Sequence, residues 1–84
     1  MCEVIKIDSI NPKKVIVTRL GVKLFNARWP GSRLETTRHY WFEFDDNRDL
    51  VDTDVPEHSD GSEALALSHD CEAFLFDDES PEWA

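Results

Sequence analysis

The feature that most constrains this chain is a run of acidic residues in its second half. Residues 43–60 carry eight carboxylates and one basic side chain, Arg48. Because like charges resist being buried together, this run has to lie at the surface of any fold that the 84 residues adopt.

Charge is distributed unevenly along the sequence. Residues 1–42 contain eight Lys or Arg and three acidic residues, a balance of plus 5, whereas residues 43–84 contain fifteen acidic residues and Arg48, a balance of minus 14. This asymmetry is typical of a protein with an electrostatic partner, or of a fold whose halves neutralise each other.

The apolar content is sufficient for one small domain. Hydrophobic residues make up 40% of the chain and include five Phe, three Trp and one Tyr, and a chain of this length supports one core. We expect a single domain over residues 1–76 and an acidic, mobile tail over residues 77–84. Trp83 could dock this tail on a partner, or the tail could be untethered.

The N-terminal sequence indicates a cytoplasmic location. It has an acid at position 3 and no apolar run of the length that secretion or membrane spanning requires, so we expect no membrane partner. Cys2 and Cys71 lack the spacing of a zinc or redox motif and are expected to stay reduced. Cys71 also lies on an apolar stripe, which favours a buried position.

Alternating apolar residues predict strands in the first third of the chain. The first strand is expected within residues 3–8. Residues 15–19 and 22–28 are expected to form a hairpin around Leu20 and Gly21, because glycine tolerates the positive φ of a tight turn.

The middle of the chain predicts a second hairpin. After a break at residues 29–32, Trp-Pro-Gly-Ser, the longest strand is expected over residues 33–45 and its partner over residues 50–55. The core face of the longer strand carries Tyr40, Phe42 and Phe44.

The last element has the periodicity of a helix. We expect an amphipathic helix over residues 62–76, begun by the capping-box spacing of Asp60 and Glu63. An alternative ends the helix near residue 70 and makes residues 72–76 a strand. The apolar stripe consists of Ala64, Leu67, Cys71, Phe74 and Leu75.

The overall expectation is an α+β fold, with an antiparallel sheet of four or five strands and one C-terminal amphipathic helix.

These elements arrange the carboxylates in two rows. Residues two apart on a strand project from one face about 6.8 Å apart, and residues seven apart on a helix lie at intervals of about 10.5 Å on one side. The hairpin row contains Glu43, Asp45, Asp52 and Asp54, and the helix row contains Glu63, Asp70 and Asp77. With Asp46, Asp49 and Glu57 they form the candidate partner-binding surface.

Regularly spaced carboxylates can imitate the phosphates of duplex DNA, which carries one charge per roughly 1.7 Å of axis. The partner would then be a basic nucleic-acid-binding protein, with no direct contact to nucleic acid. The alternative is an acidic, salt-adapted domain that makes ordinary protein contacts, because acidic surfaces also serve solubility. Either reading is non-enzymatic, since no nucleophile, base and pocket are indicated.

Metal sites are disfavoured by spacing, so no cofactor is expected. Asp45, Asn47 and Asp49 match the first three ligand positions of a calcium loop, but Leu50 and Pro56 occupy positions that need Gly and Glu. Zinc is disfavoured because His69 and Cys71 are two apart on the expected helix and do not face each other, while His58 is expected in a loop.

The basic half supports two readings. Its Lys and Arg residues, interleaved with Phe25, Trp29 and Trp41, could bind single-stranded nucleic acid by charge and stacking, although repulsion from fifteen carboxylates opposes this. Alternatively, these cations flank the acidic surface and brace it by ion pairing.

The small size, the β-rich body, the absence of a catalytic set and the clustered acidic half together resemble the phage-encoded anti-CRISPR and anti-restriction inhibitors, several of which imitate DNA. The resemblance is one of overall character, with no family motif. It implies a non-enzymatic inhibitor that acts in the host cell cytoplasm by occupying the basic surface of a CRISPR-Cas or restriction effector.

Overall fold

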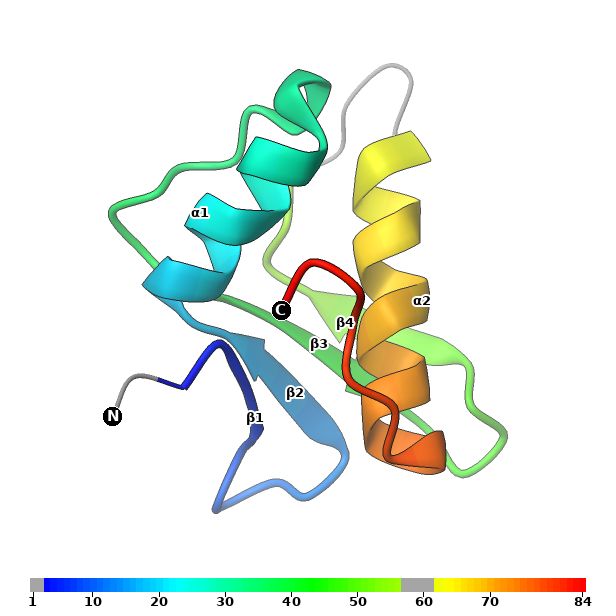
Figure 1. Cartoon of the computed structure of the whole chain (residues 1–84). Coiled ribbons are helices and arrows are strands. Elements are labelled where there is room, and N and C mark those ends of the chain that lie inside the picture. Colours follow the sequence, from blue (N-terminus) through cyan, green and yellow to red (C-terminus); the bar gives the residue numbers. More distant parts are fainter. Residues whose placement is uncertain (1–2, 57–61) are drawn as a thin grey trace.

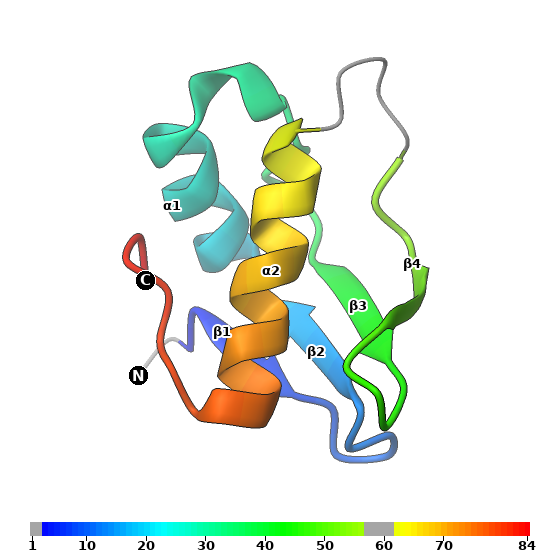
Figure 2. The same ribbon diagram turned by 90° about the vertical axis from the view of Figure 1, so that its right-hand side faces the viewer.

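The computed structural model describes residues 3–56 and 62–84, apart from the side chains of residues 62–64. In this part of the chain an antiparallel four-stranded sheet is covered on one face by two helices (Figures 1 and 2). The elements are β1 (Ile5–Ile7), β2 (Lys14–Val17), α1 (Arg19–Arg28), the 3-10 turn η1 (Pro30–Ser32), β3 (Tyr40–Phe44), β4 (Leu50–Thr53) and α2 (Ser62–Asp77). The sheet order is β1-β2-β3-β4. The predicted α+β class and C-terminal helix are confirmed, and α1 is an additional helix.

The core lies between the sheet and the helices. Val15 and Val17 of β2 are fully buried, and Tyr40, Phe42 and Phe44 of β3 point to the same side, as the alternation predicted. Each such side chain contributes about 1.5–3 kcal/mol on burial. The helices cover them with Val22, Phe25, Leu67 and Cys71.

Residues 19–28 form a helix where the sequence predicted the second strand of a hairpin, so that prediction was wrong. Thr18 is the N-cap, and its Oγ1 accepts a hydrogen bond from the backbone N–H of Gly21 at 3.3 Å. Val22 and Phe25, spaced as on one face of a helix, are both fully buried. Gly21 serves close packing instead of a turn, because a Cβ there would lie 2.2 Å from the carbonyl oxygen of Val4.

The long strand predicted over residues 33–45 is shorter in the structure. Arg33 adopts a left-handed conformation with φ 55°, which interrupts extended backbone after η1. Asn26 of α1 holds the segment that follows: its Nδ2 donates to the carbonyl oxygen of Leu34 at 2.7 Å. Leu34 is buried, so residues 33–39 are a loop anchored to α1.

The helix predicted over residues 62–76 is confirmed as α2, and the alternative that made residues 72–76 a strand is wrong. Leu67 and Cys71 of its apolar stripe are fully buried. Burial raises the pKa of the Cys71 thiol far above its ordinary value, so the group stays protonated. The proposed capping box falls on Asp60 and Glu63, outside the described side chains.

Residues 78–84 fold back against both helices, although the sequence predicted a mobile tail (Figures 1 and 2). The ring of Trp83 meets Phe25 of α1 edge-on, with 5.6 Å between centroids. Its Nε1–H donates to Oδ2 of Asp70 on α2 at 2.8 Å. Trp83 therefore buries apolar area and satisfies its one donor at the same time, which favours a docked segment.

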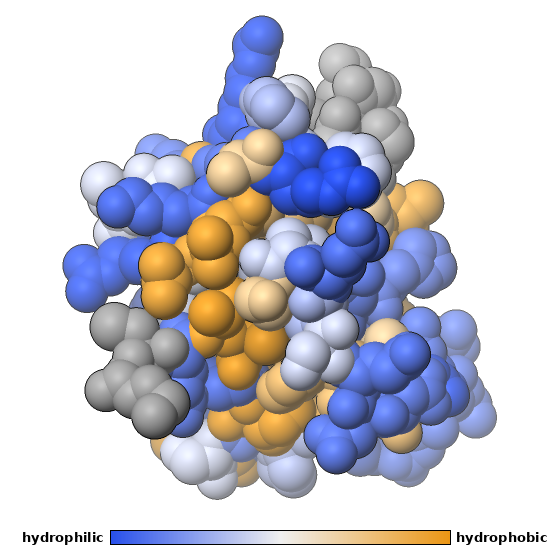
Figure 3. All heavy atoms as spheres, in the orientation of Figure 1, coloured by the Kyte–Doolittle hydropathy of each residue, from blue (hydrophilic) through white to orange (hydrophobic). Residues whose placement is uncertain are grey.

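Some apolar surface stays exposed beside this segment. Figure 3 shows hydrophobic residues gathered on the face that carries the start of α1 and the C-terminal segment. Leu20 of α1 is 37% exposed and Ile7 of β1 is 38% exposed.

Gly21→Ala should reduce the free energy of unfolding by about 1–3 kcal/mol, because the new methyl group meets backbone that cannot move aside cheaply. Urea denaturation measures the effect. Lys23→Ala, on the exposed side of the same helix, is the control and should change stability by less than about 0.5 kcal/mol. Equal stability of both variants would show that α1 does not pack this closely on Val4.

Candidate functional site

The turn between β3 and β4 is organised by Asp45. Its Oδ1 accepts the backbone N–H of Asn47 at 2.8 Å and that of Asp49 at 2.9 Å. Its carbonyl oxygen accepts the N–H of Arg48, which has a positive φ of 68°. The Asp45 oxygen that matched the first position of a calcium loop is therefore used to form the turn.

Arg48 joins this turn to the end of α2. Its Nε donates to Glu72 at 2.5 Å, and its terminal nitrogens donate to Asp77 at 2.5 and 3.1 Å. The guanidinium also lies 5.2 Å from the ring centroid of Phe76. The hydrogen bond from Arg48 lowers the pKa of Asp77, and the bonds to Asp77 and then Glu72 raise that of Arg48.

A charged row crosses the open face of the sheet. In the registers of neighbouring strands, Glu43 of β3 lies opposite Lys14 of β2 on one side and Asp52 of β4 on the other. Glu43 is half-buried, whereas Asp52 is exposed and accepts the backbone N–H of Thr53 at 2.9 Å. Two carboxylates directly opposite each other repel, and Lys14 offsets part of that repulsion.

Asp46 and Asp49 project from the turn into solvent. The side chain of Asp46 is 86% exposed and forms an ion pair with Lys13. Asp49 is exposed and has no ion pair with any described residue. Exposed pairs such as the one with Lys13 contribute less than about 1 kcal/mol, so Asp46 stays available to a partner.

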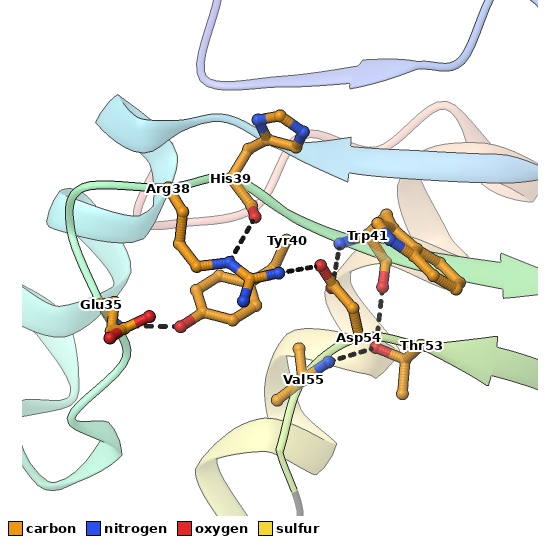
Figure 4. A network of polar contacts seen from close by, with 8 residues as sticks. All are labelled: Glu35, Arg38, His39, Tyr40, Trp41, Thr53, Asp54 and Val55. Carbon is orange, nitrogen blue, oxygen red and sulfur yellow. Dashed lines mark hydrogen bonds and ion pairs between the residues drawn. The ribbon is translucent and has the colours of Figure 1, made fainter.

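Asp54 lies just beyond β4 and is directed into the protein instead of joining the hairpin row (Figure 4). Its Oδ1 accepts the backbone N–H of Trp41 at 2.8 Å, and its Oδ2 pairs with Arg38. Beside it, the Thr53 hydroxyl donates to the Trp41 carbonyl at 2.7 Å and accepts the N–H of Val55 at 3.1 Å. This network ties the end of β4 to β3.

The two described members of the predicted helix row contact different parts of the structure. Asp70 is half-buried and holds Trp83, and Asp77 pairs with Arg48. The side chains of Glu57 and Glu63 lie outside the described part of the chain.

Three carboxylates that were not among the predicted residues lie in the last turns of α2, which Arg48 contacts, or directly after it. Glu72 contacts Arg48 directly, and Asp78 and Glu79 follow α2 and are exposed. Arg48 is the one cation in the acidic half, which could have signalled that acids distant in sequence gather around it. We call the resulting surface the acidic end; it consists of Glu43, Asp45, Asp46, Asp49, Asp52, Glu72, Asp77, Asp78 and Glu79.

The acidic end keeps a negative balance despite its internal pairs. Lys13, Lys14 and Arg48 lie beside its nine carboxylates, which leaves a balance of minus 6. The predicted bracing by cations of the basic half is confirmed for Lys13 with Asp46 and for Arg38 with Asp54.

Neither a metal cluster nor a membrane span occurs in the described ranges. No three His, Cys, Asp or Glu side chains there are grouped to hold a metal ion. No helix there is long and apolar enough to cross a bilayer. Comparisons with protein-family models, curated proteins and solved structures gave no match.

Arg48→Gln should raise the pKa of Asp77 to that of an ordinary aspartate, because the hydrogen-bonding cation is lost. NMR titration of the side-chain carboxyl carbons measures this. Asp8 is the internal control: the backbone N–H groups of Asn11 and Ile10 lower its pKa, so it should not change in the variant. Glutamine removes the charge and the terminal nitrogens that bind Asp77, and keeps the backbone cost of the positive φ.

The difference in the free energy of unfolding between wild type and Arg48→Gln should also depend on pH. Because the folded-state pKa of Asp77 is depressed, the ion pair stabilises the fold above the unfolded-state pKa and is lost as the pH falls through the folded-state pKa. Wild type should therefore exceed the variant in stability at about pH 6, with the gap narrowing toward about pH 2. A gap that does not depend on pH would contradict the ion pair.

Proposed function

We propose that this protein is a non-enzymatic inhibitor that binds a basic, nucleic-acid-handling protein through its acidic end and occupies the surface where DNA or RNA would lie. The supporting observation is the double ion pair of Arg48. It brings two acidic stretches, separated by more than twenty residues in sequence, onto one end of the molecule. The carboxylates of the β3–β4 hairpin and of the end of α2 are thereby held at one end of the molecule.

The arrangement suits a surface that competes with nucleic acid. Glu43 and Asp52 lie in register on neighbouring strands, where side chains are about 5 Å apart, and Asp46 and Asp49 extend the charge around the turn. Such spacing is comparable to that between phosphates along one strand of a duplex. Attraction to a basic groove would speed association and weaken with salt over about 8–10 Å.

Positive charge elsewhere on the molecule would orient the protein as it approaches its partner. Arg19 and Lys23 of α1 and Arg33 of the loop after η1 are exposed and form no ion pair with a described carboxylate. The positive segments lie around α1, whereas the β3–β4 turn and the end of α2 lie together at another end (Figure 1). A basic partner would attract the acidic end and repel the α1 side, so the protein would approach in one orientation.

CRISPR-Cas and restriction effectors are the target class that fits best. CRISPR effectors hold the guide–target duplex in a positively charged channel that recognises its backbone. The positive charge of such a channel would complement the negative balance of the acidic end.

The salt-adapted alternative is favoured by one observation, the internal pairing of Asp46 and Asp54 with Lys13 and Arg38. It predicts a different response to solvent: a salt-adapted domain loses its fold when salt is removed, whereas the inhibitor keeps its fold and binds its partner more tightly.

To test the proposed function, the protein is titrated into a panel of purified CRISPR-Cas effectors and restriction endonucleases with labelled target DNA. We expect it to displace DNA from at least one member in a gel-shift assay and not to bind DNA itself. Retention of DNA by every member would contradict the proposal.

On the responsive effector, Asp49→Asn with Asp52→Asn should weaken displacement about tenfold at low salt and reduce its salt dependence. The amides keep the shape of both side chains. Glu35→Gln with Glu82→Gln changes the net charge equally at exposed positions outside the acidic end and is the matched control. Equal losses in both double variants would indicate that net charge, not the acidic end, drives binding.

A further inference from the structure

A groove runs along the free edge of β1. β1 is an edge strand of the described sheet, and beside it lies a groove of about 610 Å3 whose opposite wall comes from α2 and the C-terminal segment. The groove is lined by residues 3–7, Phe74, Ser80 and Ala84. One wall is thus a strand edge and the other a helix with its following segment.

The backbone of β1 presents hydrogen-bonding groups to this groove. Thr18 donates its N–H to the carbonyl of Val4 at 3.1 Å, and Asp8 donates its N–H to Lys14 at 2.8 Å, so residues 4 and 8 are directed toward β2. Because backbone groups alternate along a strand, those of Ile5 and Ile7 point away from β2. They form the template on which another strand can pair.

The side chains beside this edge select what can pair there. Ile7 is 38% exposed, and Phe74 is partly buried at the far wall, so the part of the groove between them is apolar. Glu3 and Ser80 add polar groups at its margins. Lys6 points to the opposite, open face of the sheet and is exposed. An added strand would therefore meet apolar, basic and apolar neighbours in succession.

We propose that the β1 edge binds an extended segment of a partner protein, which adds to the sheet as a fifth strand. The segment carries an acidic residue between two apolar ones. Its backbone pairs with Ile5 and Ile7, its apolar side chains enter the groove toward Phe74, and its acid lies opposite Lys6. The proposal does not depend on the function of the acidic end.

The other edge of the sheet is closed to such pairing. On β4 the carboxylate of Asp52 already accepts the N–H of Thr53, and the register is irregular between Glu43 and Phe44. Irregular, charged edges resist strand addition.

A second copy of this chain is a poor occupant of the β1 edge. Antiparallel pairing of two β1 strands about their centre would place Lys6 opposite the same lysine, and like charges directly opposite are destabilising. A partner segment with an acid at that position relieves the repulsion.

The experiment uses a capped peptide of sequence TVEVT and 15N-labelled protein. We expect the amide signals of Ile5 and Ile7 to shift on titration and their hydrogens to exchange at least threefold more slowly. A peptide N-methylated at both valines should bind at least tenfold more weakly, because it cannot donate to the β1 carbonyls. This control does not alter the protein.

Two protein variants test the edge itself. Ile7→Pro removes the outward N–H at a position where an edge strand tolerates proline, and should weaken binding at least tenfold, whereas Ile7→Val keeps the N–H and should retain binding. Lys6→Glu should reverse the preference between TVEVT and TVKVT. The variant Asp49→Asn with Asp52→Asn should bind the peptide as wild type does.

Several results would overturn the proposal. They are unchanged Ile5 and Ile7 amides at millimolar peptide, equal binding by the N-methylated peptide, and equal binding by the proline and valine variants. Sedimentation of the free protein as a dimer with both amides protected would assign the edge to a second copy instead.

Discussion

The rest of the structure depends on one apolar contact on one side of the sheet, the only large one within the described residues. The strand side chains that project into it are Val15, Val17, Tyr40 and Phe42. Both helices and the C-terminal segment lie on this side (Figure 2). The opposite face of the sheet and the outer backbone edges of β1 and β4 take no part in this contact. Charge can therefore collect on β3, β4 and their turn without entering the core.

The acidic residues fall into two groups according to what their oxygens contact. Asp45, Asp54 and Asp70 accept N–H donors that fix the turn, the end of β4 and the C-terminal segment. Asp49 faces solvent, and the exposed Asp52 accepts only the N–H of the next residue, Thr53. The amino-acid composition does not distinguish the two groups. Removing a carboxylate of the first group disturbs the fold, whereas removing one of the second changes mainly the electrostatic field around the protein.

Periodicity was enough to locate the core face of β3 and the helix α2, because both follow from residues close together in sequence. The helix α1 was missed because its apolar residues also fit a short strand, and the glycine taken for a turn is required by the approach to Val4. The bridge from Arg48 to Glu72 and Asp77 could not be predicted, since it depends on how the hairpin turn packs against the far end of α2.

The position of Cys71 gives this protein an internal reporter. Its sulfur is fully enclosed between α2 and the sheet, and burial keeps the thiol protonated. An alkylating reagent reacts with the thiolate, so modification of this sulfur has to wait for α2 to lift from the sheet. With Cys2 replaced by serine, the rate of labelling would record how often the helix separates from the strands beneath it.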